Sequence, residues 1–339
     1  MTTTRNIAQL ADTLARAIDR RTPIINDPAI TAFRALAGDD EGAPGLTIDL
    51  LREAAIAQVY ENSPAHTLDP QALAQTALET LSPAGARSVY IKPFANDRSN
   101  KGGPPPMTTQ PTPTAGEAAP ETIRTLEDGR TLLAKPYDGF STGVFVDQRA
   151  SRRWLAERLQ PLSAPSVLNL FAYTGAFGLA AATAGAATSN VDVSGRYLSW
   201  AENNYRANNI EPGAHENRHH FPRMDAREFV AMAARKGWRF DAVVIDPPSF
   251  GAPDKRKRVP AWNAERGYAR LARDAARVVA PGGVMLCVTN TRPLCAPGAL
   301  EGTIGPAVGR GFRPVTLPPP DADVAMQRGR VARCAFERT

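Results

Sequence analysis

The sequence predicts an α/β fold: a doubly wound parallel sheet preceded by a smaller α+β domain. From residue 166 onward, short apolar runs alternate with helical patterns, which is typical of repeated βαβ units. The first unit is the clearest, because the apolar run 167–171 breaks at Tyr173-Thr174-Gly175 and a small-residue helix follows at 176–184. Ligands of such units bind against the turn and the helix N-terminus, so we expect a Rossmann-like sheet with a nucleotide-like ligand.

Asp192 supports the same fold. It closes a second short strand, 17 residues after Gly175. A carboxylate that binds a ribose hydroxyl pair usually lies about 20 residues after such a turn. The competing interpretation is that Asp192 caps the helix that begins near Ser194 and Gly195. The 17-residue offset favours the interpretation that Asp192 binds the ribose hydroxyls.

Length and composition indicate two domains and no membrane span. The 339 residues are 43% hydrophobic and 22% charged, as in ordinary globular domains, and no apolar run approaches the length of about 18 residues that a span needs. The N-terminus lacks a signal pattern, and the three cysteines (Cys287, Cys295, Cys334) have no metal-ligand spacing. We therefore expect a cytoplasmic protein without a metal. Its net charge of +6 is compatible with a polyanionic partner.

The part before the sheet is expected to comprise a helical extension, residues 1–30, and an α+β domain, residues 31–138. Apolar residues at helical spacing predict an amphipathic helix over 5–21. The domain should contain strands 46–51 and 55–60, a helix 69–81 capped by Asp69, a strand 88–93, and a hairpin of 123–127 with 130–135 around Asp128-Gly129. The Pro-rich stretch 100–121 predicts a surface loop.

The domain at 139–339 carries the doubly wound sheet. A helix is expected at 150–159 before the first strand. The strands are predicted at 167–171, 189–193, near 219–224, 242–245 and 284–288, and the helices at 176–184, 195–208, 226–236 and 262–279. Candidate strands at 312–317 and 331–336 would form an antiparallel closing hairpin.

A second motif, Asp246-Pro247-Pro248-Ser249-Phe250, follows the buried strand 242–245. The two prolines fix φ and remove two backbone donors, so carbonyl groups are left to face the crevice. Asp246 and those carbonyls can accept hydrogen bonds from a base, and Phe250 can stack on its ring. The alternative is a plain proline-rich turn. Earlier in the chain, Asp225 could accept from an adenine amino group or cap the helix that starts at Ala226.

Four segments together resemble a known family. They are residues 143–149, 168–177, 191–204 and 246–250, and Gly38 to Asp49 is similar to a further element of that family. In this combination the chain resembles the class I S-adenosylmethionine-dependent methyltransferases that modify bases of large-subunit ribosomal RNA, over roughly residues 33–295. Members usually carry an N-terminal PUA-type RNA-binding domain or a second methyltransferase, where this chain has residues 1–30.

The resemblance implies a site for S-adenosyl-L-methionine. Phe171, Tyr173 and Gly175 would shape its methionine end from positions that are glycines in the common turn, and Asn169 stands where an acid is usual. Asp192 would hold the ribose and Asp225 the adenine. Gln148 and Arg149 would close the site, with the guanidinium near the cofactor carboxylate. The expected set is completed by Phe145, Val193, Ala226 and Asp246.

The acceptor chemistry is expected to be RNA base methylation, with guanine N7 favoured. Residues 289–294 are similar to the 7-methylguanine branch, in which the ring nitrogen itself attacks, so Asp246, Phe250 and Asn290 need only orient the base. The alternative is cytosine C5 methylation, which needs a cysteine nucleophile such as Cys287 or Cys295. Asn290 occupies the place of that cysteine in the C5 branch, and Cys287 has the position of a core residue.

The expected partner is ribosomal RNA or a large-subunit particle, and Lys255, Arg256, Lys257 and Arg258 are predicted to contact its phosphates. A solvated loop is the other interpretation of this run. A third class of function is a non-catalytic RNA-binding assembly factor on the same fold. The oligomeric state, monomer or homodimer, stays open.

Overall fold

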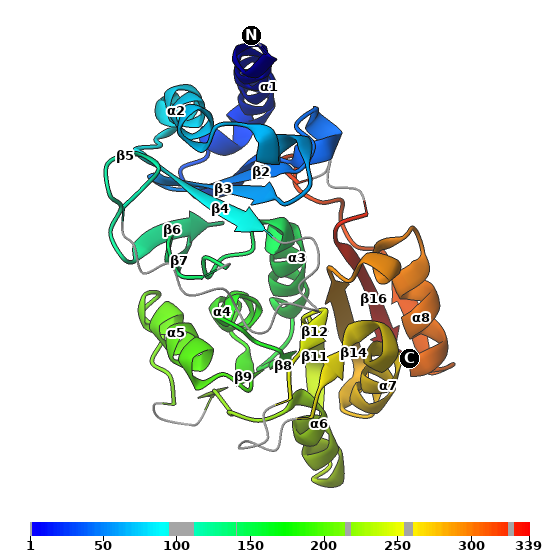
Figure 1. Ribbon diagram of the computed structural model, residues 1–339. Helices are drawn as coiled ribbons and strands as arrows, with labels where there is room; N and C mark the ends of the chain where they lie inside the picture. Colours follow the sequence, from blue (N-terminus) through cyan, green and yellow to red (C-terminus); the bar gives the residue numbers. More distant parts are fainter. Residues whose placement is uncertain (1, 95–111, 140, 214–217, 254–259, 325–328) are drawn as a thin grey trace. The chain divides into compact units, whose positions relative to one another are not determined.

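The computed structural model describes residues 2–94, 112–139, 141–213, 218–253, 260–324 and 329–339. They form two compact units: Met1–Arg149 with Pro320–Arg328, and Ala150–Pro319 with Gly329–Thr339 (Figure 1). A late segment therefore belongs to the first unit, which no sequence pattern predicted. The domain boundaries expected after residues 30 and 138 stay predictions.

The first unit is built on a five-stranded sheet of order β1-β2-β3-β4-β5. β1, β2 and β3 pair antiparallel, whereas β3 and β4 are parallel and are joined through α2. A separate antiparallel hairpin, β6–β7, follows. The strands are β1 Ala32–Leu36, β2 Leu46–Leu51, β3 Ala54–Tyr60, β4 Ser88–Phe94, β5 Ala115–Gly116, β6 Ile123–Glu127 and β7 Arg130–Ala134.

Two helices, α1 Thr2–Ile25 and α2 Pro70–Leu81, share one apolar core with this sheet. The predicted cap of α2 is confirmed, because the Asp69 side chain accepts from the backbone N–H of Ala72 at 2.8 Å. The expected loop 100–121 differs in its described part, since Ala115–Gly116 pairs antiparallel with β4. Residues 100–111 lie outside the described residues.

The second unit contains a seven-stranded sheet of order β10-β9-β8-β11-β14-β16-β15. β10, β9, β8, β11 and β14 are parallel, and β16 is antiparallel to both of its neighbours. The chain order reverses between β8 and β11, which is the topological switch point where ligands of doubly wound sheets bind. The strands are β8 Ser166–Leu170, β9 Ala187–Val191, β10 His219–His220, β11 Phe240–Ile245, β14 Val279–Thr289, β15 Phe312–Val315 and β16 Ala332–Arg338.

Helices cover both faces of this sheet. Buried residues of α6, α7 and α8 pack with one set of alternating strand residues, and those of α3 and α4 pack with the other set. This alternation follows from the two-residue repeat of a strand. The doubly wound α/β prediction is confirmed. The helices are α3 Arg149–Leu159, α4 Ala176–Thr183, α5 Gly195–Arg206, α6 Ala226–Arg235, α7 Ala264–Ala276 and α8 Ala299–Val308.

Most predicted elements are present with shifted ends, and the exceptions have physical reasons. The helix expected from 262 begins at Ala264, because Trp262–Asn263 pairs as β13 with β12, Phe250–Gly251. Helix α8 was missed, since its sequence contains Gly302, Gly305 and Pro306. The third strand is short, and its pairing continues only as a bridge between Asp192 and Arg223. In the described part of the chain, no helix has the length and apolar character to cross a bilayer.

Candidate functional site at the carboxyl edge of the sheet

The turn after β8 holds its backbone in left-handed conformations. Phe171, Tyr173 and Gly175 have φ values of +57°, +50° and +75°. Left-handed backbone is strained for residues other than glycine, by about 1–2 kcal/mol each, and such strain concentrates at functional sites. Phe171 and Tyr173, which stand where the common methyltransferase turn has glycines, therefore adopt a glycine-like backbone while carrying aromatic side chains.

Two glycines let helix α4 pack closely against its neighbours. A Cβ added at Gly175 would lie 2.7 Å from the Cβ of Ala201, and one at Gly178 would lie 1.9 Å from Oδ1 of Asn190. The same Asn190 Oδ1 accepts from the Asn169 side-chain amide at 3.0 Å. Asn169 is buried, and its side chain links β8 to β9 just before the turn.

Asp192 lies directly after β9 and faces this turn. One carboxylate oxygen accepts from the backbone N–H of Tyr173 at 3.0 Å, and the other from the N–H of Ser194 at 2.8 Å. Burial raises the pKa of Asp192 even though these backbone donors favour the charged form. The N-cap of α5 is Ser194, so the capping interpretation of Asp192 is wrong. Because each carboxylate oxygen can accept more than one bond, the group can also take ribose hydroxyls.

Asp225 is the N-cap of α6, as one of its two interpretations predicted, and accepts from the backbone N–H of Arg227 at 2.8 Å. The Arg227 guanidinium also binds both carboxylate oxygens, at 2.9 and 2.7 Å. Burial opposes the charge, yet these bonds lower the pKa of Asp225. Ala226, which follows Asp225 in the chain, is buried. Val193, which follows Asp192, is 37% exposed. An exposed apolar side chain next to a fixed acid suits one face of a planar ring.

The Asp246–Phe250 motif follows β11, directly across the switch point from the Phe171 turn. Phe250 is 59% exposed, which is unusual for a large aromatic side chain. Its backbone pairs with Asn263 in the short β12–β13 ribbon, so the ring is held on an ordered element. Pro247 is buried and Pro248 is exposed. The motif thus presents an aromatic surface close to an acid at the edge where ligands bind.

Trp262, which the sequence analysis placed inside a helix, connects three parts of this edge. Its indole Nε1 donates to the carbonyl of Pro248 at 2.8 Å. Its ring lies 5.3 Å from the Phe171 ring, and the guanidinium of Arg227 lies 5.6 Å from its centre. Gly267 leaves room for it, since a Cβ there would lie 2.9 Å from the indole. No pattern in the sequence predicts such a contact between distant loops.

Asn290, at the end of β14, is held by a directional chain of hydrogen bonds. Thr291 Oγ1 donates to Ser249 Oγ at 3.1 Å, and Ser249 Oγ donates to Asn290 Oδ1 at 3.0 Å. With its oxygen accepting, Asn290 presents the amide Nδ2 as a donor. The hydroxyl of Tyr268 reaches the carbonyls of Ile245 and Val288, at 2.6 and 2.9 Å, and so ties the ends of β11 and β14 together.

The cysteines of this region are buried. Cys287 is 0% exposed within β14 and lies opposite Cys334 of β16. Cys295 is also buried, burial raises the pKa of its thiol, and its Sγ donates to the carbonyl of Thr289 at 3.5 Å. Nucleophilic cysteines need an accessible thiolate. The buried surroundings of Cys287 and Cys295 do not favour an accessible thiolate.

The three candidates from segment 143–149 lie in the first unit. Arg149 is 1% exposed, and its guanidinium donates to Asp321 Oδ2 at 2.8 Å, to Asp323 Oδ1 at 2.6 Å and to the carbonyl of Ala32 at 3.0 Å. These contacts give Arg149 a structural role in the first unit. Its expected role at the cofactor carboxylate stays a prediction. Gln148 is buried, and the described residues offer its Oε1 no hydrogen-bond donor. Phe145 is largely exposed.

Two further predictions concern the basic segment 255–258 and the absence of a metal site. Lys255, Arg256, Lys257 and Arg258 lie outside the described residues. Among the residues that the structure does describe, no three His, Cys, Asp or Glu side chains gather as a metal site would require.

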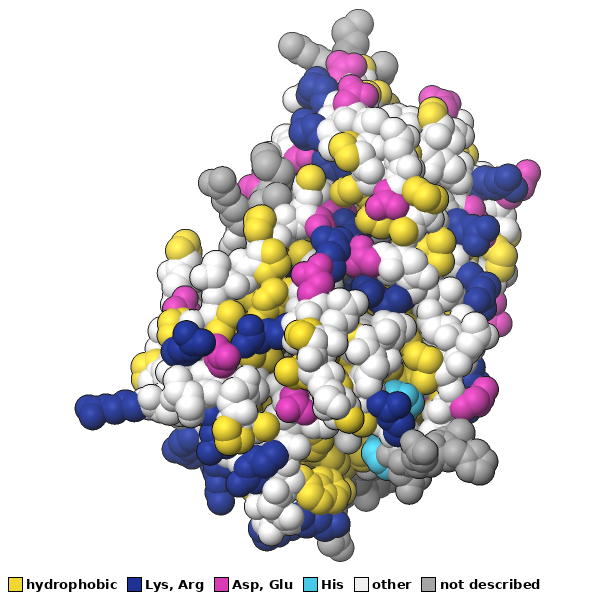
Figure 2. All heavy atoms as spheres, turned by 180° about the vertical axis from the view of Figure 1, so that it is seen from behind, with side chains coloured by type: hydrophobic (Ala, Val, Ile, Leu, Met, Phe, Trp, Pro, Cys, Tyr) yellow, Lys and Arg dark blue, Asp and Glu magenta, His cyan; other side chains and the backbone are white. Residues whose placement is uncertain are grey.

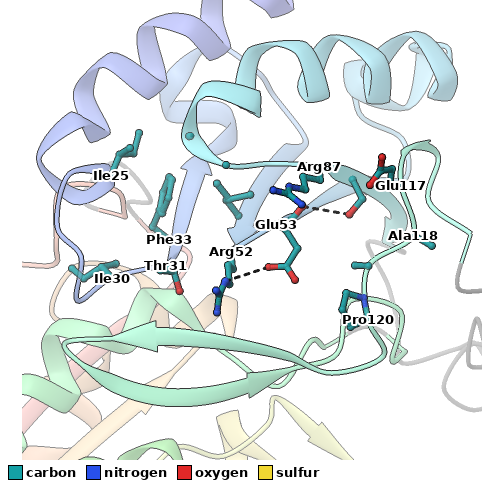
Figure 3. Close-up of a pocket in the computed structure, with 15 residues that line it drawn as sticks. Ile25, Ile30, Thr31, Phe33, Arg52, Glu53, Arg87, Glu117, Ala118 and Pro120 are labelled. Atoms are coloured by element: carbon teal, nitrogen blue, oxygen red, sulfur yellow. Dashed lines mark hydrogen bonds and ion pairs between the residues drawn. The ribbon is translucent and has the colours of Figure 1, made fainter.

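The first unit also contains a cavity of about 520 Å³ (Figure 3). Ile25, Ile30 and Phe33 form an apolar wall, and Arg52 and Glu53 form an ion pair at 3.6 Å beside the β6–β7 hairpin. Its charged lining is two arginines and two glutamates, the others being Arg87 and Glu117. The charges cancel, so the cavity offers no net attraction to a polyanion.

Known proteins are similar to this chain in sequence. A family model for S-adenosylmethionine-dependent methyltransferases matches residues 114–329. The chain is 32% identical over 281 residues to "Ribosomal RNA large subunit methyltransferase I" of Shewanella denitrificans, covering 81% of this chain and 66% of that protein. It is 31% identical over 274 residues to the protein of the same name in Aeromonas salmonicida, covering 80% and 64%. The chain therefore spans somewhat less than two thirds of these relatives.

Solved structures share the fold. A protein from Streptococcus mutans named as a SAM-dependent methyltransferase superposes with a TM-score of 0.80 at 22% identity, covering 98% of this chain and 81% of the other. A methyltransferase structure complexed with SAH gives the same values. A SAM-dependent methyltransferase from Agrobacterium tumefaciens gives a TM-score of 0.61 at 18% identity, covering 91% and 89%.

Proposed function

The chain belongs to the S-adenosylmethionine-dependent methyltransferase family, and from this premise we propose that it methylates a base of large-subunit ribosomal RNA, with guanine N7 as the acceptor atom. The names of the curated relatives support the RNA class. The choice of base is supported by the hydrogen-bonding character of Asp246 and Asn290.

The cofactor side of the proposal rests on the Phe171–Gly175 turn and the two acids beside it. When bound, S-adenosylmethionine supplies an electrophilic methyl group on its sulfonium. The left-handed backbone of Phe171 and Tyr173 turns the chain directly after β8, at the switch point, and the fixed Asp192 carboxylate can accept from ribose hydroxyls. Val193 and Ala226 offer apolar contact for the adenine, and Asp225 can accept from its amino group.

The single observation that carries the acceptor assignment is the orientation of Asn290. Because Ser249 donates to Asn290 Oδ1, the Nδ2 group remains as a donor, while the Asp246 carboxylate is an acceptor. The Watson–Crick edge of guanine offers N–H donors for an acid and the O6 acceptor for an amide. Phe250 can stack on the ring. Held in this way, guanine keeps N7 for reaction.

Guanine N7 has its own lone pair, so these residues need only align it with the methyl group. A covalent route through cysteine, as cytosine C5 would need, has less support, because Cys287 and Cys295 are buried. The substrate, whether naked RNA or a large-subunit particle, belongs to the proposal.

Incubation of the protein with methyl-labelled cofactor and unmodified large-subunit ribosomal RNA, followed by mapping of the product, tests the proposal. We expect label at guanine N7. Label at cytosine C5 that is lost in Cys287→Ala or Cys295→Ala would favour the cysteine route instead. Cofactor binding by calorimetry without any transfer to RNA would favour a non-catalytic assembly factor.

A further inference from the structure

Helix α7 carries four arginines on one outward side. Arg266, Arg270, Arg273 and Arg277, the last at its C-cap, are all exposed. Their spacing of four, three and four residues keeps them within a narrow arc of the helix surface. The opposite side is buried against the sheet through Tyr268, Leu271, Ala272 and Ala275. We call these four residues the arginine stripe.

The arginine stripe runs the length of the helix. Arg277 lies eleven positions after Arg266, which corresponds to about 16 Å of helix axis. Because α7 connects the parallel strands β11 and β14, it begins at the carboxyl edge of the sheet and ends at the amino edge. Its first turns lie by the reaction edge, where Tyr268 binds the last carbonyl of β11. The stripe therefore leads away from the Asp246–Phe250 motif.

Few acidic groups neutralise the stripe. Across the described residues, no carboxylate forms an ion pair with Arg266, Arg270 or Arg277, and Arg273 only contacts the neighbouring Asp274 at 3.7 Å. Like charges three and four residues apart destabilise a helix. Basic residues in the last turn can stabilise the helix dipole, which would explain Arg273 and Arg277. That explanation does not apply to Arg266 in the first turn or to Arg270 in the middle.

Basic character continues beyond the end of α7. The backbone N–H of Phe240 donates to the carbonyl of Val278 at 2.8 Å, which brings Arg239 and Arg277 near one another in the fold. Lys236 lies 4.8 Å from the ring of Trp238, which is 41% exposed. Lys and Arg side chains also gather at the lower left of the face in Figure 2, with few acidic side chains among them.

We propose that the arginine stripe of α7 is a docking surface for the sugar–phosphate backbone of the substrate RNA, adjoining the base site at Asp246–Phe250. The proposal rests on the proposed function. Guanidinium groups bind phosphate strongly and in a fixed geometry. A row of them beginning at the reaction edge holds the strand while one base enters the site, and it contributes affinity without selecting sequence.

The test is the salt dependence of RNA binding by the 339-residue chain. The variant Arg266→Gln/Arg270→Gln/Arg273→Gln/Arg277→Gln is compared with wild type on unmodified large-subunit ribosomal RNA. A control, Arg16→Gln/Arg87→Gln/Arg124→Gln/Arg310→Gln, removes the same charge from four exposed and scattered positions. Four phosphate contacts reduce the slope of log affinity against log salt by about 3. Between about 50 and 200 mM salt, the affinity of the stripe variant should fall about 50-fold less than that of wild type.

A stripe variant with the same slope as the scattered control overturns the proposal, provided that wild type binds and methylates the RNA. Wild type that binds the cofactor but shows no salt-dependent RNA binding overturns the proposed function as well. Loss of binding to phosphatidylserine vesicles with unchanged RNA binding would assign the stripe to a membrane surface and also overturn the proposal. Circular dichroism and calorimetry with S-adenosylmethionine confirm that each variant is folded.

Discussion

The charged groups of the first unit and those at the sheet edge of the second unit are satisfied in different ways. In the first unit, buried Arg21 binds Glu41 at 2.6 and 2.8 Å, and Arg34 binds Asp49 at 2.6 and 3.0 Å. Arg149 is held by Asp321 and Asp323. Each of these three arginines has at least one carboxylate partner, so their charges are neutralised inside the fold.

At the sheet edge of the second unit, polar side chains are fixed by backbone groups or neutral hydroxyls. Asp192 accepts from two backbone N–H groups, and Asn290 accepts from a serine hydroxyl. When neutral donors hold a carboxylate, no counter-ion balances its charge and a ligand can interact with it, whereas an arginine partner already neutralises that charge. Asp225, which pairs with Arg227, is intermediate. The comparison distinguishes charges that stabilise the fold from charges that can bind a substrate.

The largest effect is expected from Arg149→Met. Removing one partner of a buried ion pair leaves an uncompensated charge, here on Asp323, and lowers the free energy of unfolding by about 3–5 kcal/mol. Denaturant unfolding measures it. Asp321→Asn is the milder control, because Asp321 is more exposed than Asp323. Weakened cofactor binding with unchanged stability would instead place Arg149 in the cofactor site.

Asp246→Asn tests the acceptor side. The loss of a charged acceptor misplaces the base, and we expect kcat for RNA methylation to fall at least about 10²-fold. The affinity for S-adenosylmethionine should change much less. Ser249→Ala, which frees the Asn290 amide to rotate, is expected to have a smaller effect in the same direction. A normal kcat in Asp246→Asn would remove this acid from the site.

Asp192→Asn tests the cofactor side. The substitution removes the charge that backbone donors hold, and hydrogen bonds to a charged group contribute about 1.5–3 kcal/mol. Calorimetry should show a correspondingly weaker binding of S-adenosylmethionine, with unfolding little changed. A large loss of stability without a change in affinity would show that Asp192 resembles the charges of the first unit.

Trp262→Phe should have a modest and selective effect. Phenylalanine retains ring contacts with Phe171 and Arg227 but loses the hydrogen bond to Pro248, worth about 0.5–1.5 kcal/mol. Because Trp262 positions the acceptor turn, we expect kcat/KM for RNA to fall by a few fold while cofactor affinity is retained. Trp154→Phe, at a half-buried tryptophan of α3 that packs on the sheet core, is the matched control. An equal fall in both variants would contradict the positioning role.

The smallest effect concerns pH. Burial opposes the charge of Glu41, yet the hydrogen bonds from Arg21, Arg20 and the backbone of Ala37 lower its pKa below the ordinary value. A lowered carboxyl pKa adds stability above the unfolded-state value, about 4.3 for Glu, and this stability is lost as the pH falls through the folded-state pKa. Unfolding of wild type should therefore become easier on acidification below pH 5. Glu41→Gln should flatten that dependence, and an unchanged profile would contradict the assignment.

Local patterns were sufficient where one segment decides its own structure. The apolar run and the Tyr173-Thr174-Gly175 break predicted strand, turn and helix at the right place, although Phe171 lies beyond the strand because its φ is positive. The cap at Asp69 and the Asp128-Gly129 hairpin were likewise read from a few neighbouring residues. Helix α8 could not be predicted in this way, because its glycines and proline give no helical signal and its burial comes from tertiary packing.

The sequence by itself determined the α/β class, the order of the main strands and the acids at their ends, since hydrophobic period and turn residues are local properties. Only the tertiary structure decided which groups meet. It placed Trp262 between Phe171, Arg227 and Pro248, oriented Asn290 through Ser249, and enclosed Arg149 with Asp321 and Asp323. The reason is that contacts between distant segments depend on the packing of whole elements, which no window of neighbouring residues contains.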